Sequence, residues 1–239
     1  MGIAAFFDID GTLLARNSAP LYMRHLRRTG QARRRDVAWT LYYLARYKLG
    51  LLDIQSTLGE SMRFVVGKDE RTMREDCERW YVRDVRQYLY PQMAALVAAH
   101  REAGHVPVLA TSATRYLAEP LAADLGIGHF LVTQLEVEEG LFTGKVVHPI
   151  CYAEGKVHWA RALATREGLD LAESYFYTDS VTDLPLLEAV GHPLIVHPDP
   201  PLRRVAQRRG WPILRPRLGE RTPLPLAIAG PERYTPGLT

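Results

Sequence analysis

The sequence predicts an α/β protein with a Rossmann-like parallel-sheet core and a helical cap domain inserted into that core. The first observation is a continuous apolar run at residues 3–7, which ends on Asp8-Ile9-Asp10-Gly11-Thr12. Such runs are typical of strands buried on both faces of a parallel sheet. The second is that residues 18–90 contain successive amphipathic helical patterns and no clear strand. The third is the alternation of strands and helices after Pro91, which favours a right-handed parallel core.

The elements follow from these patterns in chain order. After the first strand, helices are expected at 20–28, 35–49, 54–64 and 70–88. Beyond Pro91 we expect a helix at 92–103, a strand at 106–110, a helix at 114–125, a helix at 155–167 and strands at 175–177, 194–196 and 212–214. Residues 130–147 predict a hairpin, with Glu139-Gly140 and Thr143-Gly144 as turn signals. The predicted organisation is a core of 1–17 and 91–218, a cap of 18–90 and a tail of 219–239.

Composition narrows the class of protein. The chain has 239 residues, 47% of them hydrophobic and 24% charged, which is ordinary for a globular chain. Two cysteines, Cys77 and Cys151, are too few for a disulfide scaffold and have no metal-ligand spacing. No apolar run reaches the roughly 18–20 residues of a membrane span, and no signal peptide is visible. We therefore expect a cytoplasmic protein.

Polar residues follow several of the predicted strands. Asp8 and Asp10 follow the first strand, Thr111 and Ser112 follow the second, and Asp179 and Asp183 follow the strand at 175–177. Lys156 opens a predicted helix after Gly155. Open α/β sheets bind ligands at the carboxyl ends of their strands, so these side chains are expected to meet there. Simpler interpretations are a strand-to-turn signal for the aspartates, helix caps for Thr111-Ser112 and Asp183, and a solvated lysine in a first helical turn.

These segments, in this order, resemble the four motifs of the haloacid dehalogenase superfamily of phosphatases. Asp8-Ile9-Asp10-Gly11-Thr12 is similar to the first motif, Thr111 to the Ser/Thr of the second, Lys156 to the base of the third, and residues 177–183 to the acidic fourth. The resemblance covers residues 3–214, and four ordered motifs are more specific than one. The inserted helices resemble the C1 cap of the phosphoserine-phosphatase-like branch, subfamily IB.

The resemblance implies a phosphomonoester hydrolase that forms an aspartyl-phosphate. Asp8 would be the nucleophile, and carboxylates are established covalent catalysts. Asp10 would protonate the leaving alcohol and then deprotonate the hydrolytic water. Lys156 would place a positive charge facing Asp8 and the phosphoryl oxygens. Asp183 would orient Lys156 or a metal-bound water.

Phosphate and metal ligands follow from the same chemistry. The Thr111 hydroxyl, with the Ser112 and Ala113 amides ahead of a predicted helix, is expected to bind phosphate oxygens. A carboxylate that attacks a phosphate dianion meets strong repulsion, which implies a hard divalent cation. Mg²⁺ prefers oxygen ligands and keeps several waters. Asp8, the backbone carbonyl of Asp10 and Asp179 are the expected protein ligands.

Substrate preference is where the sequence departs from the phosphoserine phosphatases. In those enzymes an acidic residue nine positions after the nucleophile binds the substrate's ammonium group, whereas this chain has Asn17 there, beside Arg16. Asparagine supplies no counter-charge, so we expect no strong preference for phosphoserine. Cap arginines, Arg63 among them, are candidates for contact with an anionic or lipid-like small-molecule phosphomonoester.

Other interpretations stay open at this stage. The reaction could be phosphoryl transfer to an acceptor alcohol, or the chain could be a non-catalytic phosphate-ligand binding protein. Arg33, Arg34 and Arg35 with the Trp39–Tyr47 aromatic stripe favour a packed cap helix over an interfacial helix with weak membrane-surface contact. Arg203, Arg204, Arg208 and Arg209 recur at helical spacing, which is typical of a solvated face. No recognition motif supports a nucleic-acid partner.

Overall fold

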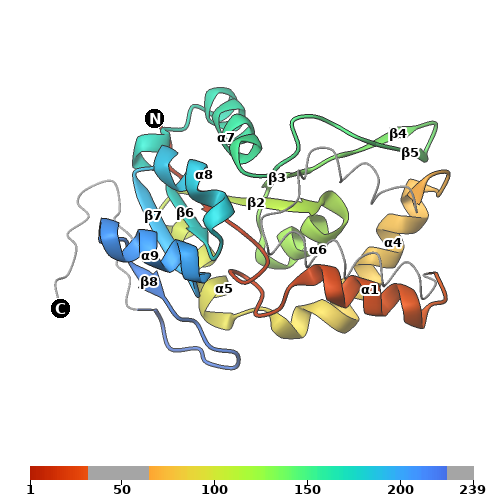
Figure 1. The fold of residues 1–239 in the computed structure, drawn as a ribbon, viewed down its shortest axis with the longest axis horizontal. Helices are drawn as coiled ribbons and strands as arrows, with labels where there is room; N and C mark the ends of the chain where they lie inside the picture. Colours follow the sequence, from red (N-terminus) through yellow and green to blue (C-terminus); the bar gives the residue numbers. More distant parts are fainter. Residues whose placement is uncertain (32–64, 225–239) are drawn as a thin grey trace.

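The computed structural model describes residues 1–31 and 65–224, and its core is a six-stranded parallel sheet (Figure 1). The strand order is β3-β2-β1-β6-β7-β8. The α/β class with a Rossmann-like core is therefore confirmed. The strands are β1 (Ala4–Phe7), β2 (Val106–Thr114), β3 (His129–Thr133), β6 (Tyr175–Thr178), β7 (His192–Val196) and β8 (Ile213–Leu214).

Strand β1 is central and is fully buried on both of its faces. Ala4 and Phe6 face one apolar cluster, and Ala5 and Phe7 face another, all with no exposed surface. This alternation explains why the sequence of the strand is continuously apolar. Complete burial of each phenylalanine contributes roughly 1.5–3 kcal/mol. The first cluster includes residues of α7 (Glu154–Glu167), α8 (Leu184–Ala189) and α9 (Pro200–Arg209), and the second includes residues of α5 (Pro91–Glu102) and α6 (Arg115–Leu125).

The chain adds strands first on one side of β1 and then on the other side. From β1 the chain adds β2 and β3 on one side, and then β6, β7 and β8 on the other. The carboxyl ends of β2, β1 and β6 therefore surround a topological switch point, the place where doubly wound sheets bind their ligands.

A helical segment lies between β1 and α5. It contains α1 (Ser18–Arg28) and α4 (Glu70–Trp80), whereas the helices expected at 35–49 and 54–64 lie outside the described residues. The single helix expected at 70–88 is instead α4, a π-helical turn η2 (Tyr81–Val85) and a 3₁₀ turn η3 (Arg86–Tyr88). Tyr81 and Val85, at the two ends of the π turn, are both buried in the core.

The prediction of a hairpin at 130–147 is partly wrong. Residues 129–133 form β3, an edge strand of the main sheet parallel to β2, and only β4 (Leu135–Glu138) and β5 (Leu141–Val146) form the hairpin. Glu139 and Gly140 do make the turn, both with positive φ. The second turn signal, Thr143-Gly144, lies inside β5. A single residue, Gln134, separates β3 from the hairpin, so no turn signal marks that boundary.

The hairpin is hydrogen-bonded to the residues that come directly before α4. Gly67 N–H donates to the Phe142 carbonyl at 2.9 Å, and Phe142 N–H donates to the Lys68 carbonyl at 3.0 Å. Arg74 of α4 forms ion pairs with Glu70 and with Glu119 of α6. These contacts fix α4 to the core.

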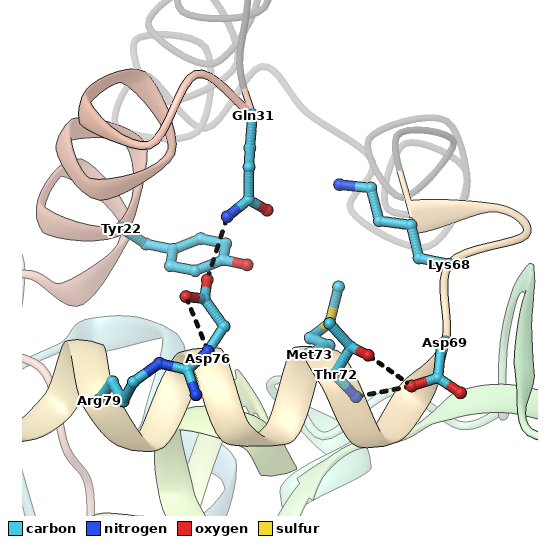
Figure 2. Close-up of a pocket in the computed structure, with 8 residues that line it drawn as sticks. All are labelled: Tyr22, Gln31, Lys68, Asp69, Thr72, Met73, Asp76 and Arg79. Atoms are coloured by element: carbon cyan, nitrogen blue, oxygen red, sulfur yellow. Dashed lines mark hydrogen bonds and ion pairs between the residues drawn. The ribbon is translucent and has the colours of Figure 1, made fainter.

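Between α1 and α4 the structure has a cavity of about 330 Å³, and most of the residues that line it have polar or charged side chains (Figure 2). Tyr22 and Gln31 line one side of it, and Asp76 of α4 accepts a hydrogen bond from Gln31 at 3.2 Å. None of the predicted catalytic residues lines this cavity.

One further prediction about the exterior of the protein is confirmed. The arginines of α9 are exposed, as expected for a solvated helix face. The start of the predicted tail packs against α5, because Gln92 Nε2 donates to the Thr222 carbonyl at 2.7 Å. In the described part of the chain, no helix is both long enough and apolar enough to cross a membrane.

Candidate active site

Asp8 and Asp10 lie in the loop that follows β1. Gly11 makes this loop possible, because its φ is +80° and a Cβ there would lie 2.2 Å from Asp179 Oδ2. The close approach places the Asp179 carboxylate directly over the backbone that follows Asp10. Two strand ends far apart in sequence therefore meet at Gly11.

Lys156 is buried in the first turn of α7, with only 3% of its side chain exposed. Its Nζ lies 3.0 Å from Asp8 Oδ1 and 2.8 Å from Asp183 Oδ2. Gly155 allows this position, because a Cβ there would lie 1.8 Å from the Ile150 carbonyl oxygen. The solvated-lysine interpretation is therefore wrong.

Asp183 is held by two partners. Besides Lys156, it accepts a hydrogen bond from Thr178 Oγ1 at 2.6 Å. Asp183 precedes α8, but within the described structure its side chain makes no capping bond to that helix. The side chain therefore orients the lysine, and the interpretation as a helix cap is not met.

Asp10 faces the first helix of the inserted segment. Its Oδ1 accepts from Ser18 N–H and its Oδ2 from Ser18 Oγ, both at 2.8 Å. Ser18 is buried at the first position of α1. The two bonds tie this carboxylate to the place where the inserted segment begins.

Thr111 and Ser112 lie inside β2 and not after it. The strand continues to Thr114 through an irregular register, and α6 begins only at Arg115. The Thr111 side chain is buried and accepts a hydrogen bond from Ala113 N–H at 3.1 Å, whereas Ser112 is exposed. Because Phe7 is paired with Leu109, Thr111 lies level with the loop that carries Asp8.

Four carboxyl groups, those of Asp8, Asp10, Asp179 and Asp183, crowd this strand edge. Burial raises the pKa of Asp8 to about 7, although Lys156 acts in the opposite direction. Burial raises the pKa of Asp10 to about 6, and burial together with Asp8 and Asp183 raises that of Asp179 to about 8. Burial acts to lower the pKa of Lys156, but Asp183 and Asp8 outweigh it and hold that pKa above its ordinary value. The carboxylates thus outnumber the cation that faces them.

This donor set fits a hard divalent cation. Asp8 and Asp179 supply carboxylate oxygens, and Asp179 is packed over the backbone of the loop that carries the Asp10 carbonyl. Among residues 1–31 and 65–224, no three acidic, histidine or cysteine side chains gather tightly enough to hold a metal by themselves. Two carboxylates with one carbonyl leave room for the waters that Mg²⁺ retains.

The residues proposed for substrate preference are less informative. Asn17 is exposed and caps α1, because its side-chain oxygen accepts from Ala19 N–H at 3.0 Å. Arg63 lies outside the described residues, as do Arg33–Arg35 and the aromatic stripe at 39–47.

Sequence analysis missed three residues that contact the site: Ser18, Thr178 and Asp199, whose N–H donates to the Asp179 carbonyl at 2.9 Å. Thr178 lies within the fourth motif, so the sequence indicated that it is near the site but not that it binds Asp183. Ser18 precedes a predicted helix, and Asp199 stands before Pro200-Pro201, which is a recognisable N-cap signal.

Comparisons with known proteins identify a family and several similar phosphatases. The family model for haloacid dehalogenase-like hydrolases matches residues 5–188. A probable phosphatase of Mycobacterium tuberculosis is 36% identical, over 95% of this chain and 81% of its own length. A phosphoserine phosphatase of the same species is 34% identical, over 88% and 70%. A histidinol-phosphatase of Neisseria meningitidis is 29% identical, over 88% and 97%.

A solved structure has the same fold. The crystal structure of a Bordetella pertussis protein of unknown function superposes with a TM-score of 0.81 and 31% identity, covering 89% of this chain and 98% of that one. The segment that the family model matches, residues 5–188, contains the candidate site from Asp8 to Asp183.

Proposed function

Because the chain belongs to the family of haloacid dehalogenase-like hydrolases and is similar to its phosphatases, we propose that it hydrolyses a small phosphomonoester through an aspartyl-phosphate on Asp8. The observation that carries the proposal is the fixed contact between Asp8 and the buried Lys156, with Asp10 and Asp179 beside them. A cytoplasmic location stays a prediction.

The two half-reactions use Asp8 and Asp10. An Asp8 carboxylate oxygen attacks phosphorus, the bond from phosphorus to the ester oxygen breaks, and Asp10 gives its proton to the departing alkoxide. Asp10 then takes a proton from water as the water oxygen attacks phosphorus. The bond from phosphorus to Asp8 breaks, which releases inorganic phosphate and restores both carboxyl groups.

The remaining residues would supply positive charge, orient other side chains or bind the phosphoryl group. Lys156 faces the attacking carboxylate and offsets negative charge on the phosphoryl oxygens, and Asp183 keeps the lysine in place. Thr111 and the backbone near Ser112 are proposed to bind phosphoryl oxygens. Mg²⁺, held by Asp8, the Asp10 carbonyl and Asp179, would neutralise the repulsion between carboxylate and phosphate when bound.

The test is turnover of p-nitrophenyl phosphate with Mg²⁺, with EDTA, and by Asp8→Asn protein. We expect EDTA to abolish turnover. Asp8→Asn should lower it by roughly 10³-fold or more, since a covalent nucleophile is lost, while its circular dichroism spectrum stays unchanged. Near-normal turnover by Asp8→Asn, after a check for contaminating phosphatase, would refute the covalent mechanism. Full activity in EDTA would refute the metal assignment.

We further propose that phosphoserine is not strongly preferred. The Asn17 oxygen, at the position expected to face a substrate ammonium group, is already engaged as the cap of α1, and it carries no charge. Arg16 beside it, placed 5.9 Å from the centre of the Tyr88 ring, disfavours a cation. A charge-assisted hydrogen bond exceeds a neutral one by about 1 kcal/mol or more.

Asn17→Asp tests this pocket, because aspartate caps a helix as well as asparagine does. We expect kcat/KM for phosphoserine to rise by about tenfold, since roughly 1.4 kcal/mol corresponds to that factor. Glycerol 3-phosphate, which lacks an ammonium group, is the control substrate and should not gain. A strong preference for phosphoserine that persists in Asn17→Ala protein would show that the pocket lies elsewhere.

A further inference from the structure

The loop that carries Asp179 and Asp183 is held from two sides. On its inner side, Thr178 and Lys156 bind Asp183. On its outer side lies Asp199, which follows the neighbouring strand β7 and is only partly buried. The inner contacts belong to the proposed chemistry, whereas Asp199 has no part in it.

Asp199 is hydrogen-bonded both to the loop around Asp179 and to α9. Its N–H donates to the Asp179 carbonyl at 2.9 Å, and its Oδ2 accepts from Val181 N–H at 2.9 Å. Its Oδ1 accepts from Leu202 N–H at 2.7 Å, which caps α9. Leu202 is fully buried in the core. One carboxylate thus joins the loop around Asp179 to a helix that is anchored in the core.

We infer that Asp199 is a positioning residue, which fixes the backbone on both sides of residue 180 and so orients the Asp179 carboxylate toward a divalent cation. The inference rests on the proposed function, because it takes Asp179 as a Mg²⁺ ligand. Groups that orient metal ligands typically change metal affinity by about 10–100-fold when they are replaced.

A serine at position 199 separates the two roles of the carboxylate. Serine is as good an N-cap as aspartate, so it keeps the bond to Leu202 N–H. Its single oxygen cannot also reach Val181 N–H, so the loop bond is lost. Asp69 provides a matched control, because it caps α4 through the same spacing, accepting from Thr72 N–H at 2.7 Å, and is far from the fourth motif in sequence.

The experiment measures Mg²⁺ binding by calorimetry on the full chain without substrate, together with the melting temperature, for wild type, Asp199→Ser and Asp69→Ser. We expect Asp199→Ser to bind Mg²⁺ about tenfold more weakly than wild type, with a melting temperature close to that of Asp69→Ser. Asp69→Ser should bind Mg²⁺ as wild type does. Turnover of p-nitrophenyl phosphate by Asp199→Ser should recover when Mg²⁺ is raised about tenfold, with KM for the ester unchanged.

Each other result is decisive. Mg²⁺ affinity of Asp199→Ser within twofold of wild type would overturn this inference alone, because Asp199 would then be only a helix cap. Equal losses of affinity in both serine variants would overturn it as well. A wild-type chain that binds no Mg²⁺ would overturn the proposed function and the inference together.

Discussion

At its carboxyl end, strand β6 leads into Asp179 and Asp183, while at its amino end Tyr175 lies among three histidines. His105 and His192 stack against the Tyr175 ring, with ring centres 5.4 and 4.4 Å away. His100 lies behind them, with Nδ1 2.8 Å from His105 Nδ1 and Nε2 2.7 Å from the Tyr177 hydroxyl. We call these groups the histidine cluster, and we call Asp8, Asp10, Asp179, Asp183 and Lys156 the carboxylate cluster.

Burial acts on both clusters but with different results. It raises the pKa of Asp8 and of Asp179, and it lowers the pKa of His100 to about 3. The carboxylate cluster contains a buried cation, so Lys156 preserves charge there. In the histidine cluster, Glu173 acts to raise the pKa of His192, but burial outweighs it and lowers that pKa. The balance of burial and charge therefore differs between the two ends of β6.

Removal of Lys156 should break this distinction with the largest effect. In Lys156→Met the side chain keeps its length but loses its charge, which leaves Asp8 and Asp183 buried without a cation. We expect turnover to fall by about 10²–10³-fold, and stability to fall by roughly 3 kcal/mol. Initial rates and urea unfolding measure the two effects.

Lys145→Met is the control for this change. Lys145 is 72% exposed and pairs with Glu136 on the surface of the hairpin. Its replacement should leave rate and stability unchanged, since exposed pairs contribute little. An equal loss in both variants would mean that burial of the pair is irrelevant.

The pH dependence of stability separates the clusters by sign. The folded chain keeps His100 neutral down to about pH 3, while the unfolded chain takes a proton below about pH 6.5. Stability contributed by this histidine is therefore present above pH 6.5 and lost as pH falls below it. Carboxyl groups with raised pKa values have the opposite slope, so a direct pH titration of wild type would mix the two.

Subtraction of a His100→Phe variant isolates the histidine contribution. Phenylalanine keeps the edge contact with Phe7 and removes both ring nitrogens. The stability advantage of wild type over the variant should shrink by about 2 kcal/mol between pH 7.5 and pH 5, because one pH unit corresponds to about 1.4 kcal/mol per proton. Urea unfolding at both pH values measures it, and a constant difference would contradict the assignment.

Tyr177→Phe should have the smallest effect and sharpens the comparison. Tyr177 is stacked on Phe7 at 4.6 Å between ring centres, and its hydroxyl reaches His100. Loss of that bond should cost about 1 kcal/mol and change turnover by less than twofold. A tenfold loss of turnover without unfolding would show that the two ends of β6 communicate.

Much of the site could be predicted because its residues lie directly after strands whose apolar runs are unmistakable. Asp8 and Asp179 were placed in this way, whereas Lys156 was placed in the first turn of a helix after Gly155. Gly11 and Gly155 mark the two close approaches that bring these residues together. The predictions that failed concern the limits of two strands. The strand 129–133 runs into the hairpin without a turn signal, and the extension of β2 through Thr111 depends on its pairing with β3.

Residues that act through hydrogen bonds between distant segments were not predictable. Asp199 signals a helix cap in the sequence, but its bond to Val181 depends on β7 lying beside β6. Ser18 likewise shows only that a helix begins, and its two bonds to Asp10 require the path of the loop. A sequence pattern reports local geometry, whereas these contacts come from the strand order.

The separation between Asp8 and Lys156 also has a consequence for synthesis of the chain. Asp8 precedes its lysine partner by 148 residues, so at about 5–20 residues per second the ribosome needs about 7–30 s to deliver the second after the first. During that interval β1, whose four residues are all apolar, lacks its neighbour β6. Only a chain synthesised beyond Asp183 can therefore assemble the carboxylate cluster.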